Sequence, residues 1–187
     1  MIANAMVDIW LSLGYGPIPK YEDDLKPMCY PVLDGHILGA NGYCYNYDLN
    51  DMKEAIANLN VPWHPEKGTL VFASRVVFIG YEWDLEEHWV ALPEAKHLKF
   101  LYRVQLFVKK FCRNNKAQPC TLIDIQQLHC SLCHVAFVYL EGHTRLPSLS
   151  NFAIEFSNRP SAKHYPPRSL FADLDWWIDT LNKPSYR

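Results

Sequence analysis

The stretch that decides the fold is YGPIPKYEDDLKP, residues 15–27. An apolar approach leads into Tyr21, and the adjacent carboxylates of Asp23 and Asp24 follow, so we expect a tight turn between two strands. Two neighbouring carboxylates on such a turn can hold Mg²⁺ against a triphosphate, because hard oxygen ligands suit this ion and phosphoryl displacement requires charge neutralisation. The pattern therefore points to nucleotidyl transfer, and a solvated acidic turn is the alternative interpretation.

The residues after this turn predict a helix that packs on a sheet. Asp48 is a candidate helix cap with an acidic residue three positions on, Asp51, and apolar residues then recur at helical spacing as far as residue 60. Two prolines in residues 61–68 prevent the helix from continuing. The segments that follow predict two strands and a hairpin: residues 69–73, 75–81 and 81–92.

Apolar spacing predicts further helices in both halves of the chain. The helix over residues 93–113 is expected to bury one stripe of side chains: Leu98, Leu101, Val104, Val108 and Phe111. Other helices are expected over residues 1–13, from a Thr121 cap to Ala136, over residues 149–156, and from a Ser169 cap to Leu181. Residues 158–168 contain three prolines and predict a linker.

Four short motifs occur in a fixed order along the chain. They are YxDD at residues 21–24, PEKG at 65–68, FIGYEWD at 78–84 and LPExK at 92–96. This order resembles the second half of the palm and the thumb of a retroelement reverse transcriptase, most closely those of fungal retrotransposons. A fainter similarity at residues 173–177 (DLDWW) resembles the entry to the connection region before a ribonuclease H domain.

The resemblance implies roles for individual residues. Asp23 and Asp24 match the paired metal-binding aspartates, with Asp23 as the more direct Mg²⁺ ligand, and Tyr21 would lie beside the primer terminus. Lys67 matches the lysine proposed to protonate the leaving pyrophosphate, a role that suits a mobile ammonium group. The hairpin that holds the primer strand would present Phe78, Gly80, Tyr81 and Trp83.

The resemblance also implies an α+β architecture with an antiparallel sheet of about three to five strands and helices on one face. Residues 1–92 would form a partial palm, residues 93–156 a helical thumb, and residues 157–187 a linker and C-terminal helix toward a missing connection region. A two-metal site needs another carboxylate on a preceding strand, and the family places a fingers domain before the turn. Because 20 residues precede Tyr21, we expect a fragment that is inactive alone, binds Mg²⁺ weakly without nucleotide, and is completed by an upstream fingers–palm polypeptide.

A basic segment offers a second candidate surface. The formal net charge of −2 and the pI near 6.4 argue against strong nonspecific nucleic-acid binding by the whole chain. Cations nevertheless gather in residues 96–116, and a thumb helix could use four of them to follow an RNA or DNA template–primer backbone: Lys96, Lys99, Arg103 and Lys110. An ordinary solvated helix face is the alternative interpretation.

The six cysteines form no compact framework, which favours reduced thiols. Cys130, Cys133 and His134 match the CxxCH pattern of haem attachment or half a zinc site, but an amphipathic helix with small buried thiols and a buried His134 explains the same residues. We find neither an apolar run long enough for a membrane span nor a signal pattern, so an intracellular location, cytoplasm or nucleus, is expected.

Two further function classes stay open beside the polymerase-derived one. The chain could be a repurposed module that binds nucleic acid or a protein partner, or a small metal-binding protein built on the acidic turn or the Cys-His helix. Trp63 is interpreted as a core residue. The pair Trp176–Trp177 needs a covering surface, which is either the thumb itself or the missing region beyond it.

Overall fold

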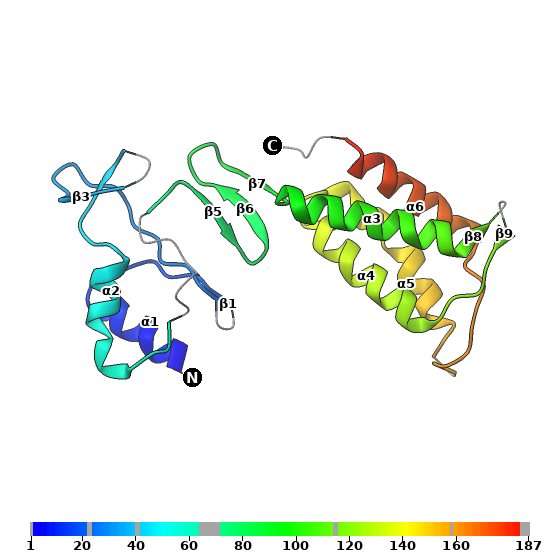
Figure 1. Cartoon of the computed structure of the whole chain (residues 1–187), viewed down its shortest axis with the longest axis horizontal. Coiled ribbons are helices and arrows are strands. Elements are labelled where there is room, and N and C mark those ends of the chain that lie inside the picture. Colours follow the sequence, from blue (N-terminus) through cyan, green and yellow to red (C-terminus); the bar gives the residue numbers. More distant parts are fainter. Residues whose placement is uncertain are drawn as a thin grey trace. The chain divides into compact units, whose positions relative to one another are not determined.

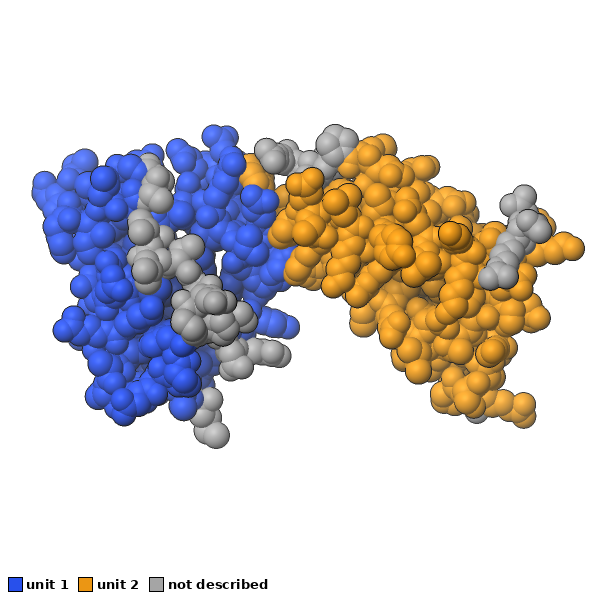
Figure 2. All heavy atoms as spheres, viewed as in Figure 1, with its two compact units in different colours: residues 1–88 blue, residues 89–187 orange. Residues whose placement is uncertain are grey.

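The computed structural model describes residues 2–21, 24–39, 42–63, 72–113, 116–157 and 159–183. The chain divides into two compact units, Met1–His88 and Trp89–Arg187 (Figure 2). In the described residues the first unit combines helices with small antiparallel strand pairs, and the second is mainly helical (Figure 1). The fold class is therefore α+β, as the sequence predicts.

The first unit is built around the packing of α1 (Ile2–Ser12) on α2 (Leu49–Ala55). The helix expected at the start of the chain is confirmed, and it buries Met6 and Trp10 on adjacent turns. The indole nitrogen of Trp10 donates a hydrogen bond to the Met52 carbonyl oxygen at 2.7 Å. This bond satisfies the polar atom of the largest side chain in the cluster, which would otherwise be costly to bury.

The N-terminus of α2 confirms the predicted cap. One carboxylate oxygen of Asp48 accepts hydrogen bonds from the backbone amides of Asn50 and Asp51, at 2.7 Å and 3.0 Å. The Asp51 carboxylate accepts in return from the Asp48 amide at 2.8 Å, which completes a capping box. The helix is shorter than expected, because its last turn tightens into η1 (Ala57–Leu59).

Trp63 was interpreted as a core residue, and this is wrong. Its side chain is 41% exposed and stacks on Trp10, with ring centroids 6.4 Å apart. Met52 and Ile56 are both almost fully buried beside Trp10, so the interior of the cluster is filled from α2. Trp63 therefore covers the rim of the cluster.

The single sheet expected for the first unit is also wrong. The described strands of residues 20–91 form three separate small sheets instead: β1 pairs with β2, β3 pairs with β4, and a three-stranded sheet has the order β5, β6 and β7 (Trp89–Ala91). Their bounds are β1 (Lys20–Tyr21), β2 (Asp24–Leu25), β3 (Ile37–Leu38), β4 (Cys44–Tyr45), β5 (Arg75–Phe78) and β6 (Tyr81–Asp84). Pro19, Pro27 and Pro31 offer no backbone N–H, so the early segments cannot extend into a wider hydrogen-bonded ladder.

The segment over residues 75–81 was expected to be one strand, but the chain reverses inside it. Phe78 pairs with Tyr81 across β5 and β6, which leaves Ile79 and Gly80 as a two-residue turn. Their φ values are +46° and +85°, the left-handed pair of a type I′ hairpin. Of the strand expected over residues 69–73, the described part (residues 72–73) is not in a strand, and the rest lies outside the described residues.

The second unit is a helical body. It contains β7 (Trp89–Ala91), α3 (Glu94–Phe111), β8 (Cys112–Arg113), β9 (Lys116–Ala117), α4 (Leu122–Ala136), η2 (Leu140–Arg145), α5 (Pro147–Ile154) and α6 (Arg168–Leu181). Helix α3 packs against α4 and α6, and α4 packs against α5 and η2. Side chains from these packed helices form the core. Its fully buried residues include Ile125, Leu132, Leu149, Leu170, Leu174 and Trp177.

Helix α3 buries a face that only partly matches the expected one. Val104 and Phe111 are buried as predicted, but the other buried residues are His97, Phe100 and Phe107, whereas Leu98 is 57% exposed. Phenylalanine side chains bury more apolar area than the leucine and valine residues of the predicted stripe, so the helix turns its aromatic face inward. The rotation brings the basic residues of α3 next to the buried face.

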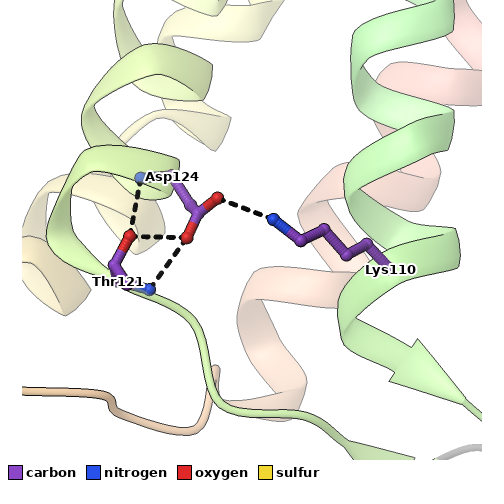
Figure 3. Close-up of polar contacts among 3 residues, drawn as sticks. All are labelled: Lys110, Thr121 and Asp124. Atoms are coloured by element: carbon purple, nitrogen blue, oxygen red, sulfur yellow. Dashed lines mark hydrogen bonds and ion pairs between the residues drawn. The ribbon is translucent and has the colours of Figure 1, made fainter.

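Helix α4 begins as predicted. The Thr121 hydroxyl accepts from the Asp124 amide at 3.3 Å, and the Asp124 carboxylate accepts from the Thr121 amide at 3.0 Å (Figure 3). Helix α6 does not use the predicted Ser169 cap, because it starts one residue earlier, after Pro167, without a side-chain cap. Pro167 has an extended backbone, which directs the chain into the helix without such a cap.

The Trp176–Trp177 pair finds its cover inside the second unit. Trp177 is fully buried, and Trp176 is half-buried with its ring 5.5 Å from the Arg145 guanidinium carbon. Gly142 makes room for Trp177: a Cβ at this glycine would lie 2.0 Å from Cη2 of the indole. Of the two alternatives, docking on the helical unit is therefore the one observed.

Candidate nucleic-acid interface

The acidic turn is flanked by paired strands. Tyr21 on β1 lies opposite Asp24 on β2, and both residues are exposed. Lys20 on β1 donates a hydrogen bond to the Asn4 side-chain oxygen, which ties this hairpin to α1. Asp23 and Lys67 lie outside the described residues, so the proposed catalytic set stays a prediction of the sequence.

The residues predicted to hold the primer strand lie on the hairpin of β5 and β6 or in its turn, where local contacts hold the hairpin together. The Trp83 indole nitrogen donates to the Phe78 carbonyl oxygen at 3.2 Å, which links the two strands next to the Gly80 turn. Tyr81 is 6% exposed, and burial raises the pKa of its hydroxyl. A Tyr81 contact to nucleic acid would therefore need this side chain to become uncovered.

Asp84 closes the other end of this hairpin. Its carboxylate accepts hydrogen bonds from the Glu87 and Glu86 amides at 2.9 Å and 3.1 Å and from Arg75 Nε at 2.5 Å. The Glu87 amide and the Arg75 guanidinium together hold the pKa of Asp84 below its ordinary value. Asp84 thus has a structural role in setting the loop after β6.

The Cys-His segment lies on α4 but differs from the expected buried thiols. Cys130 and Cys133 are both exposed. Cys133 Sγ lies 3.6 Å from Nε2 of His129, and partial burial together with Cys130 raises the pKa of the Cys133 thiol. His134 is half-buried rather than buried, with its ring 5.5 Å from Phe100. The thiols point outward because Leu128 and Leu132 already occupy the inner face of α4.

No candidate metal centre emerges from the residues that the structure describes. Among them, no group of three or more His, Cys, Asp or Glu side chains is arranged to hold a metal ion. Asp24 offers one exposed carboxylate, which is the donor type that Mg²⁺ accepts. Metal binding by Asp23 and Asp24 therefore stays a prediction of the sequence motif.

A groove with a volume of about 910 Å³ lies between α3 and α4. Four basic residues predicted to contact nucleic acid all line it: Lys96, Lys99, Arg103 and Lys110. Buried aromatic and aliphatic side chains form its floor, including Phe100, Phe107 and Leu128. The two helices run beside each other in the helical unit (Figure 1).

Helical geometry explains why these cations share one groove. With 3.6 residues per turn, Lys96, Lys99 and Arg103 fall on one side of α3. This side borders the buried stripe that contains Phe100 and Phe107. The aliphatic stems of the cations can therefore pack along the apolar floor while their charged ends reach the rim.

Contacts with α4 fix two of the cations. Arg103 Nη1 donates to the Ser131 hydroxyl at 2.7 Å, and this hydroxyl donates to the Gln127 carbonyl oxygen at 2.8 Å. Lys110 forms an ion pair with Asp124 at 3.0 Å (Figure 3). The charged groups of Arg103 and Lys110 are thereby held by partners that face α3 across the groove.

Asp124 combines two tasks, because it belongs to the helix cap and to the ion pair. Burial acts to raise its pKa, but hydrogen bonds from the Thr121 hydroxyl and amide and from Lys110 outweigh this effect. The resulting pKa lies below the ordinary value, so Asp124 is ionised at neutral pH. The sequence predicted the Thr121 cap but not the place of Asp124, Gln127 and Ser131 on the rim of the groove.

Charge is divided unequally between the two units. Residues 1–88 contain 13 acidic and five basic side chains, whereas residues 89–187 contain seven acidic and 13 basic ones. The formal net charges are therefore −8 and +6, which the value of −2 for the whole chain conceals. The groove belongs to the basic unit.

No family model, curated protein or solved structure matches the chain. In the part of the chain that the structure describes, the helices are too short or too polar to cross a membrane. The interpretation of the groove consequently rests on its geometry and charge.

Proposed function

We propose that this chain derives from the palm and thumb of a reverse transcriptase and that its helical unit binds nucleic acid through the α3–α4 groove. The observation that carries the proposal is the convergence of Lys96, Lys99, Arg103 and Lys110 on one groove of a unit with a formal charge of +6. Phosphate binding by such cations releases condensed counterions, which provides affinity without sequence preference.

The order of the elements supports the polymerase derivation. The strands that flank the YEDD turn precede a capped helix, the β5–β6 hairpin at residues 75–84 and the long helix α3. In this proposal the first unit corresponds to part of a palm and the second to a thumb. RNA or DNA template–primer is the corresponding ligand.

Catalysis by the chain alone is not part of the proposal. A two-metal site needs carboxylates that bridge both ions, and Asp23 with Asp24 would supply two neighbouring groups. Primer extension with Mg²⁺ or Mn²⁺ tests this, and we expect no incorporation. Template-dependent synthesis that Asp23→Asn abolishes would contradict this expectation.

The binding proposal is tested by fluorescence anisotropy with a labelled primer–template duplex. Affinity should fall as salt rises, and Lys99→Glu with Arg103→Glu should reduce the slope of log affinity against log salt by about two. The matched control is Lys109→Glu with Lys163→Glu, which makes the same charge change at exposed positions that do not line the groove. Equal losses in both double variants, or no duplex binding at low salt, would refute the groove as the site.

A further inference from the structure

The two rims of the α3–α4 groove differ in chemistry. Four cations come from α3: Lys96 and Lys99 lie along its rim, whereas Arg103 and Lys110 reach across to Ser131 and Asp124. The rest of the α4 rim is largely neutral, with Gln126, Gln127, Cys130 and Ser131 along it. A ligand that is anionic along one edge and neutral but polar along the other would match both rims. A nucleic-acid strand with its bases turned to one side has this distribution of charge.

We infer that the groove accepts a single strand of nucleic acid, with phosphates on α3 and bases toward α4, in preference to a duplex. The inference rests on the proposed nucleic-acid-binding function and specifies its ligand. In a duplex the bases are stacked inside, and phosphates dominate the surface that a protein contacts. Such a surface would leave the neutral rim and the apolar floor unused.

The lining of the groove offers the Arg103 guanidinium as a group on which an unpaired base can stack. Phe100, Phe107 and Leu128 also line the groove but are only 4–8% exposed, whereas Arg103 is exposed and its guanidinium carbon lies 6.0 Å from the Phe100 ring centroid. Base faces stack on aromatic rings and on guanidinium planes when a strand is not paired. The glutamine side chains on the α4 rim can donate to and accept from base edges.

The spacing of the cations along the groove favours the same ligand. Lys96, Lys99 and Arg103 are spaced by about 4.5 Å and about 6 Å along the helix axis, from a rise of about 1.5 Å per residue. One strand of a duplex carries a phosphate for roughly every 3.4 Å of the duplex axis, whereas an unpaired strand is free to adapt its spacing to these cations.

Tyr102 adds a second platform outside the groove. It is 63% exposed on α3 and immediately precedes Arg103. A base that leaves the groove over the basic stripe could stack on this ring. The exposed tyrosine therefore extends the surface that unpaired bases can use.

The test compares three probes with the full chain at one salt concentration: a labelled 12-nucleotide single strand, the duplex of the same sequence, and inorganic polyphosphate as competitor. We expect the single strand to bind at least about tenfold more tightly than the duplex, because stacking adds to the phosphate contacts. Polyphosphate should compete weakly, since it lacks bases. Lys99→Glu with Arg103→Glu should weaken binding of both nucleic acids.

A second pair of variants separates base contacts from charge. Gln126→Ala with Gln127→Ala should lower single-strand affinity about three- to tenfold and leave duplex affinity unchanged. Gln105→Ala, at an exposed position of α3 that does not line the groove, is the control and should change neither. Equal affinities for strand and duplex, with no effect of the glutamine changes, would refute the inference while the proposed function stands. Loss of binding to every probe would refute both.

Discussion

His97 and Leu181 are joined across the helical unit: Nε2 of His97 lies 2.6 Å from the Leu181 carbonyl oxygen. A carbonyl oxygen accepts only, so Nε2 carries the hydrogen of this bond. Nδ1 lies 3.3 Å from the Tyr139 hydroxyl, which donates to it when the imidazole is neutral. One buried side chain thus ties the first turn of α3 to the last residue of α6, whose carbonyl lacks a partner within its own helix.

Replacing this histidine should destabilise the helical unit. His97→Ala removes the donor to Leu181 and opens a cavity beneath Tyr139, at a position that is 8% exposed. We expect a loss of about 2–3 kcal/mol in the free energy of unfolding, measured by urea denaturation. His143→Ala, at an exposed position, is the control and should stay within about 0.5 kcal/mol of the unaltered chain. An equally small effect of His97→Ala would show that the buried bond contributes nothing.

Gly142 should tolerate no side chain. A Cβ at this residue would overlap Cη2 of Trp177, a fully buried ring that cannot move away without disturbing α6. We expect Gly142→Ala to lower the free energy of unfolding by about 1–3 kcal/mol in thermal or urea denaturation. Asn151→Ala, exposed on α5, provides the comparison. A melting temperature unchanged by the glycine substitution would contradict the observed seat of Trp177.

Replacing Ile79 in the turn between β5 and β6 should stabilise the chain. Ile79 adopts φ of +46°, a conformation that costs a β-branched residue about 1–2 kcal/mol and that asparagine accepts readily. Ile79→Asn should therefore raise the free energy of unfolding by about 0.5–1 kcal/mol after the loss of some apolar burial. Val77→Asn, on the exposed face of β5, should instead be neutral or destabilising. A destabilised Ile79→Asn chain would mean that packing of the isoleucine outweighs its strain.

Asp84 should make the free energy of unfolding depend on pH in the acidic range. Its folded pKa lies below the unfolded value of about 3.9, so its contribution is present above that pH and is lost as pH falls through the folded pKa. Unfolding measured from pH 5 down to pH 2.5 should show a decline that is smaller in Asp84→Asn, because the amide cannot lose a charge. Glu54→Gln, exposed on α2, controls for the removal of one carboxylate. Identical pH profiles for Asp84→Asn and the unaltered chain would exclude this role.

Features set by neighbouring residues in the chain were predicted from the sequence, whereas features set by tertiary packing were not. The caps at Asp48 and Thr121 were predicted correctly, because each depends on residues within three positions along the chain. The inner face of α3 was predicted only in part, because Leu98 and Phe100 both fit a helical repeat and packing against α4 and α6 decides between them. Ile79 was read as a strand residue because β-branched side chains favour strands, whereas strand pairing places it in a turn.

The residues of the candidate site likewise include some that the sequence predicted and some that it did not. Lys96, Lys99, Arg103 and Lys110 were identified from their clustering in sequence, and the groove that unites them is set by the rotation of α3. The α4 rim was not identified, since Gln127 and Ser131 are ordinary polar residues until a neighbouring helix faces them. A search for polar positions four residues apart beside the inner face of α4 would have suggested both.

The ion pair between Lys110 and Asp124 links stability to binding. Asp124→Asn keeps an oxygen that can accept from Thr121 but loses the charge that holds Lys110, so we expect a loss of about 0.5–1.5 kcal/mol in the free energy of unfolding. The same change frees a lysine in the groove, and nucleic-acid affinity at low salt should rise about two- to fivefold with a salt slope steeper by about one. Asp175→Asn, exposed on α6, makes the same change of charge elsewhere in the unit and should alter neither property by as much. Weaker binding by Asp124→Asn, in a chain whose circular dichroism shows α4 still folded, would mean that Asp124 supports the binding conformation of Lys110 rather than competing for it.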